Sequence, residues 1–380
     1  MEKSNKGKKV KLLLTNNSLD NGGAERVLVN LVNNLPQDKY DITLFTLYSS
    51  GIYDKSINKL VNYKYVFKKR GRFFNKVMLK ILCKVVPFNW LRKFVVNKTF
   101  DYEIAFLQGY PTEFVRASKS NSTQKIAFVH SDFANNYDVA GFYKTKTQCY
   151  EAYKTFDKVC FISETAKNGF EKVIGPLSNA YIVHNVVDTE SIRNQAKERS
   201  EQVFSENAFK IVSVGRLINL KAIDRIINAV EQVKKSGIRI ECCIVGDGPE
   251  RESLQQLIKD KKLENYIKIM GYCANPYKYV KQADLYVCSS LTEGYSTSAV
   301  EALILGVPIL TTNVSGMHEI IGNCECGVIV DNTEDAFKEG LEMLAKDHDM
   351  IEKMKEEAKN RSMVFNSKVQ IKEFMDMLEK

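Results

Sequence analysis

The chain has 380 residues, of which 44% are hydrophobic and 27% are charged. This balance is typical of globular proteins, excludes a largely disordered chain or a fibrous repeat, and at this length favours two α/β domains over one. Lysine and arginine outnumber aspartate and glutamate by 55 to 46, and the net charge of +9 favours an anionic partner.

The N-terminal residues are basic, but only a short apolar run at residues 10–14 follows them. This pattern predicts neither a secretion signal nor a membrane span. Nine cysteines are scattered along the chain, and the closest groups, Cys242 with Cys243 and Cys324 with Cys326, lack the second half of a zinc-binding pattern. We therefore expect reduced, mainly structural thiols in a cytoplasmic protein.

Short runs rich in β-branched residues alternate with amphipathic segments in the first half of the chain. They predict strands of a mostly parallel sheet at residues 10–14, 40–47, 101–107, 125–129, 158–162 and 181–184.

A basic segment interrupts this series, because residues 56–100 contain twelve lysines and arginines and no acidic residue. Lys76, Lys80 and Lys84 recur at helical spacing beside apolar residues, and Trp90 follows. This pattern is typical of an amphipathic helix that faces an anionic membrane, although a helix of the first domain with a solvated basic edge would show it too. No nucleic-acid-binding motif accompanies the charge, so we expect no nucleic-acid partner.

A polar stretch at residues 193–207 separates the first series from a second one, and we place the interdomain linker there. The strands of the second series are predicted at residues 210–214, 238–245, 267–270, 285–288, 308–312 and 327–330. After them, the pattern of residues 334–380 predicts two or three charged helices.

Two cations follow the first strand of the second series. Gly215 and Arg216 end this strand and Lys221 lies five residues beyond Arg216. Ligands of open α/β sheets bind beyond the carboxyl ends of the strands, so these side chains could hold a diphosphate, although an ordinary solvated loop can carry the same residues.

A second candidate segment, residues 289–301, follows the strand at 285–288. Gly294, Ser296 and Thr297 would allow phosphate to approach a helix N-terminus, where backbone N–H groups favour an anion. Glu301, one turn inside the helix, could accept hydrogen bonds from ribose, and Glu293 from a sugar.

This segment, with the Gly-Val-Pro that follows it, resembles the nucleotide-sugar signature of glycosyltransferase family 4. The resemblance implies the GT-B fold, which has two Rossmann-like doubly wound α/β lobes and an interlobe cleft. It implies an N-terminal acceptor-binding lobe at residues 1–190, a C-terminal nucleotide-sugar-binding lobe at 205–365, and a C-terminal helix at 366–380 that can pack back on the first lobe.

Other segments extend the resemblance. Residues 21–26 (NGGAER) are similar to the glycine-rich loop of the first lobe, and residues 182–188 (IVHNVVD) to the interlobe segment, although His184 and Val186 replace a proline and a glycine. Residues 246–250 (GDGPE) match a loop of the second lobe. Neither glycine pair has the third glycine of a dinucleotide-binding loop, which disfavours an oxidoreductase.

The resemblance implies roles for individual residues. Arg216, Lys221, Glu293 and His130, at the end of the strand at 125–129, are the implied catalytic residues, with His184 as a competing histidine. No metal motif is present, so we expect no metal and no cofactor besides the co-substrate. The implied donor-binding residues are Gly22, Gly23, Gly215, Arg216, Lys221, Gly271, Tyr272, Glu293, Gly294, Ser296, Thr297 and Glu301.

The sequence thus predicts a retaining glycosyltransferase that transfers a hexose from a nucleotide sugar, with UDP favoured, to a glycan or lipid-linked glycan acceptor in surface polysaccharide assembly. We expect it in the cytoplasm, bound peripherally to the inner face of the cell membrane. A nonenzymatic nucleotide-sugar or glycan-binding module and a GT-B sugar phosphorylase or epimerase are the alternatives.

Overall fold

A computed structural model of the protein describes residues 8–20, 22–49, 51–68, 88, 90, 92, 96, 98–134, 143–199 and 201–380. The chain forms two compact units. The first contains Met1–Val186 and Lys368–Lys380, and the second contains Val187–Ser367.

A parallel sheet forms the centre of the first unit, with strand order β3-β2-β1-β4-β5-β6-β7. All six strands predicted here are confirmed. Edge strand β3 was not predicted, because it lies within the basic segment at residues 56–100. The strands are β1 (Val10–Asn16), β2 (Tyr40–Ser49), β3 (Asn62–Lys68), β4 (Tyr102–Ala105), β5 (Gln124–Val129), β6 (Lys158–Phe161) and β7 (Ala180–Ile182).

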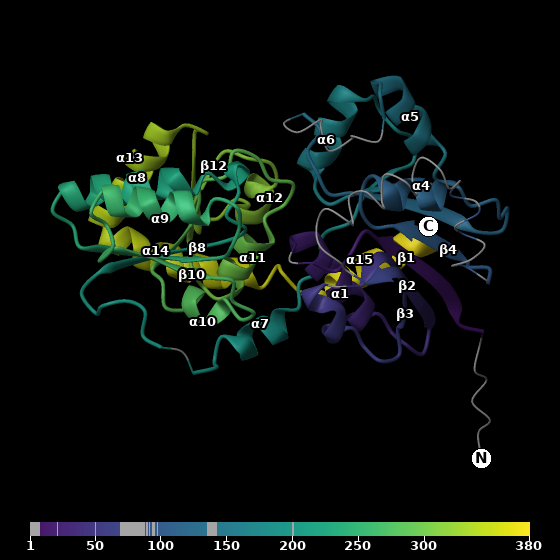
Figure 1. Ribbon diagram of the computed structural model, residues 1–380, viewed down its shortest axis with the longest axis horizontal. Coiled ribbons are helices and arrows are strands. Elements are labelled where there is room, and N and C mark those ends of the chain that lie inside the picture. The colour runs from purple at the N-terminus through teal and green to yellow at the C-terminus, as the bar shows by residue number, and fades with distance from the viewer. Residues whose placement is uncertain are drawn as a thin grey trace, which may run out of the picture. The chain divides into compact units, whose positions relative to one another are not determined.

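Helices cover both faces of this sheet. Successive side chains of each strand point to opposite faces, and apolar side chains on both faces are buried against helices. Phe128 packs in one core with α1 (Gly23–Asn34) and α15 (Ser367–Glu379). Its neighbour Val129 packs on the other side, near α5 (Lys146–Lys154) and α6 (Glu164–Val173). The remaining elements of this unit are η1 (Ile52–Ser56), α4 (Tyr110–Arg116), α5 (Lys146–Lys154) and α6 (Glu164–Val173) (Figure 1).

The last helix, α15, is bound to the first sheet by polar and apolar contacts. Phe374 packs against Phe128, with ring centroids 6.3 Å apart. The buried Lys158 Nζ donates to the carbonyl oxygens of Met377 and Leu378 at 2.8 and 3.0 Å. These carbonyls belong to the last helical turn, which has no intrahelical donors for them, so Lys158 caps the helix.

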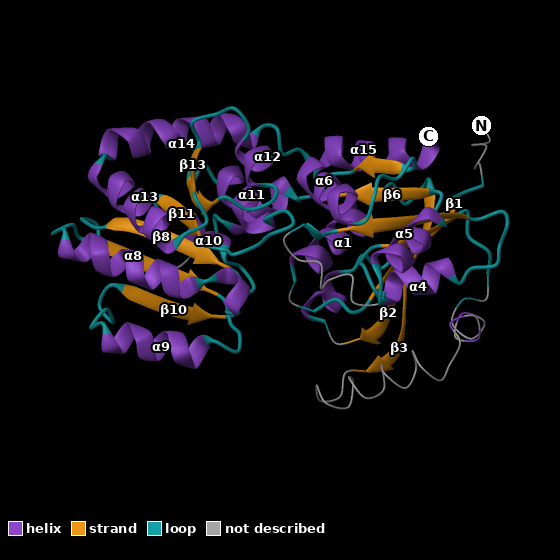
Figure 2. Cartoon of the chain, turned by 90° about the horizontal axis from the view of Figure 1, so that it is seen from above, coloured by secondary structure: helices purple, strands orange, loops and turns teal. Residues whose placement is uncertain are grey.

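A second parallel sheet forms the centre of the second unit, with order β10-β9-β8-β11-β12-β13 (Figure 2). All six predicted strands are confirmed: β8 (Phe209–Val214), β9 (Ile240–Val245), β10 (Ile267–Gly271), β11 (Leu285–Cys288), β12 (Ile309–Thr312) and β13 (Gly327–Val330).

This sheet also has helices on both faces. Cys242 packs into the core that contains α8 (Ile223–Lys235) and α13 (Glu334–Lys346). Cys243 packs into the core that contains α10 (Tyr277–Val280) and α11 (Thr297–Ile304). The elements are α7 (Thr189–Gln195), η3 (Asn219–Lys221), α8 (Ile223–Lys235), α9 (Arg251–Asp260), α10 (Tyr277–Val280), α11 (Thr297–Ile304), α12 (Met317–Ile321), α13 (Glu334–Lys346) and α14 (His348–Ser362).

The boundary between the units lies earlier than the predicted linker. The polar stretch at 193–207 is not a linker in the structure, because its apolar residues Val203 and Phe204 are buried in the core of the second unit. The chain passes from one unit to the other at Val186–Val187 and again at Ser367–Lys368.

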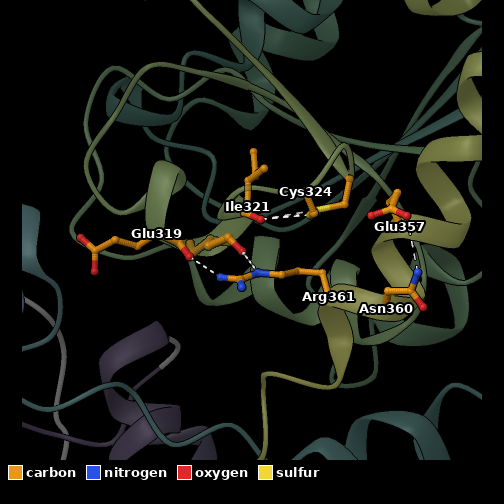
Figure 3. Close-up of a disulfide and its surroundings, with 8 residues drawn as sticks. Glu319, Ile321, Cys324, Glu357, Asn360 and Arg361 are labelled. Carbon is orange, nitrogen blue, oxygen red and sulfur yellow. Dashed lines mark hydrogen bonds between the residues drawn. A yellow bond between two sulfur atoms is a disulfide. The ribbon is translucent and has the colours of Figure 1, made fainter.

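One prediction about the cysteines is wrong. Cys324 and Cys326 form a disulfide before β13, where both sulfurs lie near the carbonyl oxygen of Ile321 at the end of α12 (Figure 3). Arg361 donates to the carbonyls of Glu319 and Ile320, so the end of this helix is held from two sides. The other described cysteines are free thiols.

Lys76, Lys80 and Lys84 lie outside the described residues. Trp90 is described, and 64% of its surface is exposed. Across the described part of the chain, no helix is both long and apolar enough to cross a bilayer.

We predict that Lys158→Met lowers the free energy of unfolding by about 1–3 kcal/mol, because it removes the Lys158 donor from the Met377 carbonyl oxygen and leaves the Leu378 carbonyl oxygen with only the Tyr102 hydroxyl. Chemical denaturation measures the loss, and amide hydrogen exchange should accelerate in residues 368–380. Lys119→Met, which removes an exposed lysine of the same unit, serves as the control. Equal effects of the two substitutions would contradict the capping role.

Candidate active site

The predicted donor-binding residues of the second unit lie at one edge of its sheet, at strand ends, in the loops that follow them and in α11. Since the strands are parallel, the loops after β8, β9, β10, β11 and β12 all leave from the carboxyl edge (Figure 2). This edge is where open α/β sheets bind ligands.

The loops after β8 and β9 touch through their backbones. A Cβ atom on Gly246 would lie 1.7 Å from the carbonyl oxygen of Gly215, and one on Gly248 would lie 2.2 Å from that of Leu217. Leu217 N donates to Asp247 O at 3.0 Å. The Gly-Asp-Gly sequence therefore allows two loops to pack closely, which explains it without a dinucleotide.

An ion pair joins the two segments that the sequence singled out. Lys221 Nζ, in η3 after β8, and Glu293 Oε1, after β11, lie 2.5 Å apart. Only 26% of the lysine side chain and 10% of the glutamate side chain are exposed. Burial alone would lower the pKa of Lys221, but the charge of Glu293 and this hydrogen bond together raise the pKa above its ordinary value, so the ammonium is retained.

Side chains around this ion pair fix its position. Ser290 Oγ donates to the same oxygen of Glu293 at 2.7 Å. Ser289 Oγ hydrogen-bonds to the carbonyl oxygen of Ala222 at 2.8 Å, and Ala222 has the left-handed conformation with φ 45°. The two serines thus hold the carboxylate and the lysine-bearing turn in one arrangement.

Arg216 is placed differently from Lys221. Its side chain is exposed, and among the described residues no carboxylate lies within ion-pairing distance of its guanidinium. The guanidinium lies near enough to Lys221 for its charge to lower the pKa of that lysine. The edge of the sheet thus presents an arginine that is available for an anion.

Helix α11 presents its N-terminus and a buried carboxylate at the same edge. Ser296 caps the helix by accepting from Ala299 N at 3.4 Å, which leaves the amides of Thr297 and Ser298 without intrahelical partners. Glu301 is only 5% exposed, and Oε1 accepts a hydrogen bond from Tyr277 OH at 3.2 Å. Glu301 is therefore a buried, positioned acceptor.

The end of β10 provides two of the predicted donor-binding residues. Gly271 has φ 73°, and its carbonyl oxygen accepts from Gly246 N at 2.9 Å. Tyr272 follows with 39% of its surface exposed. An exposed aromatic ring at the edge of the sheet offers a face on which a base can stack.

In the first unit, Gly22 and Gly23 begin α1 after β1. Gly22 is the N-cap residue without a side-chain cap, and a Cβ atom there would lie 1.9 Å from Glu25 Oε2. The carboxylate of Glu25 thus lies at the start of α1, beside the two predicted donor-binding glycines. Phosphate could approach these glycines only if Glu25 turned away.

His130 lies at the carboxyl end of β5 beside two aromatic rings. Its ring centroid is 4.8 Å from that of Phe106 and 6.1 Å from that of Phe128. Burial lowers the pKa of His130 to about 4, against a smaller opposing effect of a hydrogen bond with the backbone of Phe106. Nε2 is buried and has no hydrogen-bond partner among the described residues, so a neutral imidazole presents a free polar atom.

His184, the competing histidine, has a different setting. Nδ1 lies 3.1 Å from the Glu373 carboxylate of α15. This contact ties the segment after β7 to the C-terminal helix, which is a structural role.

Ser290 and Tyr277 were not predicted from the sequence to have a role in the site. Ser290 lies within the segment chosen for its glutamates, and its spacing of three residues from Glu293 could have suggested the contact. Tyr277 gave no signal, because its contact with Glu301 joins two helices 24 residues apart. Within the described ranges, no group of three potential metal ligands lies together.

Comparisons with known families cover almost the whole chain. Residues 21–191 match the model of Glycosyltransferase Family 4, and residues 194–361 match that of Glycosyl transferases group 1. The chain belongs to glycosyltransferase family 4. Both the recognised family and the predicted fold class are confirmed.

Curated relatives of this family 4 chain match part of it. It is 28% identical over 217 residues to the N-acetylgalactosamine-N,N'-diacetylbacillosaminyl-diphospho-undecaprenol 4-alpha-N-acetylgalactosaminyltransferase of Campylobacter jejuni, covering 56% of this chain and 58% of that one. It is 26% identical over 231 residues to the poly(ribitol-phosphate) alpha-N-acetylglucosaminyltransferase of Staphylococcus aureus, covering 58% and 44%. The matched stretch thus spans about half the length of these relatives.

Solved structures match the family 4 chain along nearly its full length. The HepE protein of Anabaena, crystallised with UDP and glucose, has a TM-score of 0.77 at 18% identity and covers 98% of this chain and 100% of that one. Sucrose-phosphate synthase of Thermosynechococcus elongatus has a TM-score of 0.78 at 13% identity, with 98% of each chain covered. These similarities establish the GT-B fold.

We predict that His130 makes the protein less stable in acid. The unfolded chain binds a proton at the ordinary pKa of 6.5 and the folded chain only near 4, so stability present above pH 6.5 is lost as the pH falls toward 4. When the pH falls from 7 to 5, the free energy of unfolding of the wild type should drop by about 1–2 kcal/mol more than that of His130→Gln.

Chemical denaturation at the two pH values measures this difference. His348→Gln, which removes an exposed histidine, should behave as the wild type does. An unchanged pH dependence in His130→Gln would show that the folded protein protonates His130 as easily as the unfolded chain does.

Proposed function

We propose that the protein is a retaining glycosyltransferase that transfers a hexose from a nucleotide sugar, with UDP favoured, to a glycan or lipid-linked glycan acceptor in surface polysaccharide assembly. The observation that carries this proposal is the group formed by Arg216, the Lys221–Glu293 ion pair and buried Glu301 at one sheet edge. Cations for a diphosphate and a carboxylate for ribose are the features that such a donor requires.

The comparisons support the donor assignment. Structures of HepE were solved with UDP, with UDP and glucose, and with UDP-glucose, and a mutant of TarM from S. aureus was solved in a complex that includes UDP. In our proposal the base stacks on Tyr272, Glu301 accepts from the ribose, and the diphosphate lies between Arg216 and the N-terminus of α11. Gly294, Ser296 and Thr297 allow its close approach.

The proposed mechanism uses positioning and charge. As the bond from the sugar to the diphosphate breaks, negative charge grows on the leaving group, and Arg216 and Lys221 stabilise it. Glu293 is bound to Lys221 and Ser290, which supports a role in orientation rather than attack on the anomeric carbon. The acceptor then reacts on the face that the diphosphate leaves, and a diphosphate oxygen accepts its proton.

The first unit supplies the remaining proposed contacts. Neutral His130 offers Nε2 to a hydroxyl of the transferred sugar. Gly22 and Gly23 contact the donor phosphate or acceptor once Glu25 has moved from the start of α1.

We infer a membrane-bound acceptor from two observations. Residues 56–100 carry twelve basic residues and no acidic one, which favours the anionic inner face of the cell membrane. The C. jejuni relative is named for a diphospho-undecaprenol acceptor and the S. aureus relative for poly(ribitol-phosphate).

Turnover of UDP-sugars with membrane extract as the acceptor source tests the proposal, with loss of donor and transfer of radiolabelled sugar as the measurements. We expect transfer in the presence of EDTA, since protein cations can neutralise the diphosphate. Binding of the donor without turnover would indicate a binding module, and release of a sugar phosphate only when phosphate is added would indicate a phosphorylase.

In the same assay, Arg216→Ala should lower kcat about 100-fold while donor KM changes less than about threefold, because the charge that Arg216 stabilises grows during bond cleavage. Arg239→Ala, at the amino end of β9, is the matched control and should keep wild-type kcat. An increase in KM with unchanged kcat would restrict Arg216 to binding the donor.

A further inference from the structure

Tyr277 is a buried residue of α10 to which neither the sequence nor the family comparisons assign a role. Only 3% of its surface is exposed, and its hydroxyl lies 3.2 Å from Glu301 Oε1. A buried carboxylate is costly unless hydrogen bonds satisfy it, and a tyrosine hydroxyl is a suitable donor. The contact therefore stabilises Glu301 and restricts its rotamers.

A carboxylate can bind a diol while it is hydrogen-bonded to protein. Each carboxylate oxygen has two lone pairs, so Glu301 Oε1 can accept from a ligand as well as from Tyr277. Two neighbouring ribose hydroxyls can donate to the two oxygens only when the carboxylate plane is fixed. A carboxylate that rotated freely would lose this advantage when it bound the ribose.

Tyr277 also lies next to the segment proposed to contact the base. Its helix begins directly after residues 271–276. Asn275 Nδ2 anchors this loop by donating to Gln195 O at 2.8 Å and to Glu198 Oε2 at 2.9 Å. The loop is thus held at Asn275, and the Tyr277 hydroxyl connects its far end to the helix that carries Glu301.

We propose that Tyr277 is a positioning residue that orients Glu301 toward the 2′ and 3′ hydroxyls of the nucleotide, and so gives the site its preference for ribose over a sugar that lacks them. This inference rests on the proposed function, because it takes Glu301 as the ribose contact. Tyr277 touches neither the nucleotide nor the transferred sugar, and acts through the carboxylate.

Titration calorimetry of the 380-residue chain with UDP and with 2′,3′-dideoxy-UDP tests the inference. The wild type should bind UDP at least about 10-fold more tightly than the dideoxy compound, because the dideoxy compound offers the buried Glu301 carboxylate no hydroxyl donors. Tyr277→Phe should weaken UDP binding about 5- to 10-fold and change dideoxy-UDP binding less than about twofold. The dideoxy compound thereby reports whether the variant's site is folded.

Tyr279→Phe is the matched control. It removes a hydroxyl from a buried tyrosine of the same helix, whose ring lies 5.1 Å from Lys278 Nζ. This variant should keep the wild-type ratio of the two affinities, whereas Glu301→Gln should reduce the ratio.

The outcomes separate the inference from the function on which it rests. If Tyr277→Phe weakens both ligands equally, Tyr277 is merely structural and the inference is overturned. If Glu301→Gln reduces the ratio and Tyr277→Phe does not, the inference fails while the ribose contact stands. If the wild type does not distinguish the ligands, the proposed ribose contact itself fails, and the inference fails with it.

Discussion

The ion pair between Lys221 and Glu293 is the interaction on which the candidate site depends. It joins the loop after β8 to the loop after β11, and β8 and β11 are neighbouring strands of the second sheet. Partly buried ion pairs contribute little net stability, because desolvation offsets the attraction, but they do fix one arrangement of the groups around them. Here that arrangement includes Ser290, which binds Glu293, and Ser289, which holds the turn after Lys221.

The charges around this pair differ in how freely they can meet a ligand. Lys221 is already bound to a carboxylate, while Arg216 is exposed beside it. An incoming diphosphate would meet the arginine first and would share the lysine with Glu293. Without a donor, the positive charges of Arg216 and Lys221 repel each other. The carboxylate of Glu293 offsets part of this repulsion, so the site can hold both cations before the donor binds.

The predictable features were those set by local patterns. Runs of β-branched residues identified the strands of both sheets, except β3, whose lysines obscured its alternation. The sequence also singled out Glu301 as a candidate, through its spacing from Glu293. Burial of Glu301 was not predictable, because it depends on α10 packing against α11.

Contacts between distant segments account for what the sequence did not reveal. The polar stretch at 193–207 looked like a linker because its charged residues outnumber Val203 and Phe204, yet these two side chains anchor it in the second unit. The Cys324–Cys326 disulfide depends on a turn before β13, and cysteine spacing does not show whether two thiols are oxidised. The role of Tyr277 depends wholly on tertiary structure.

Hydrogen exchange of the 380-residue chain, measured by mass spectrometry with and without UDP, tests most directly whether the carboxyl edge of the second sheet holds the nucleotide. We predict slower amide exchange in residues 215–222, 271–277 and 293–301 when UDP is bound, with unchanged exchange at the opposite edge around Arg239. If saturating UDP slows exchange only within residues 8–186 and leaves those three segments unchanged, the nucleotide does not bind at this edge.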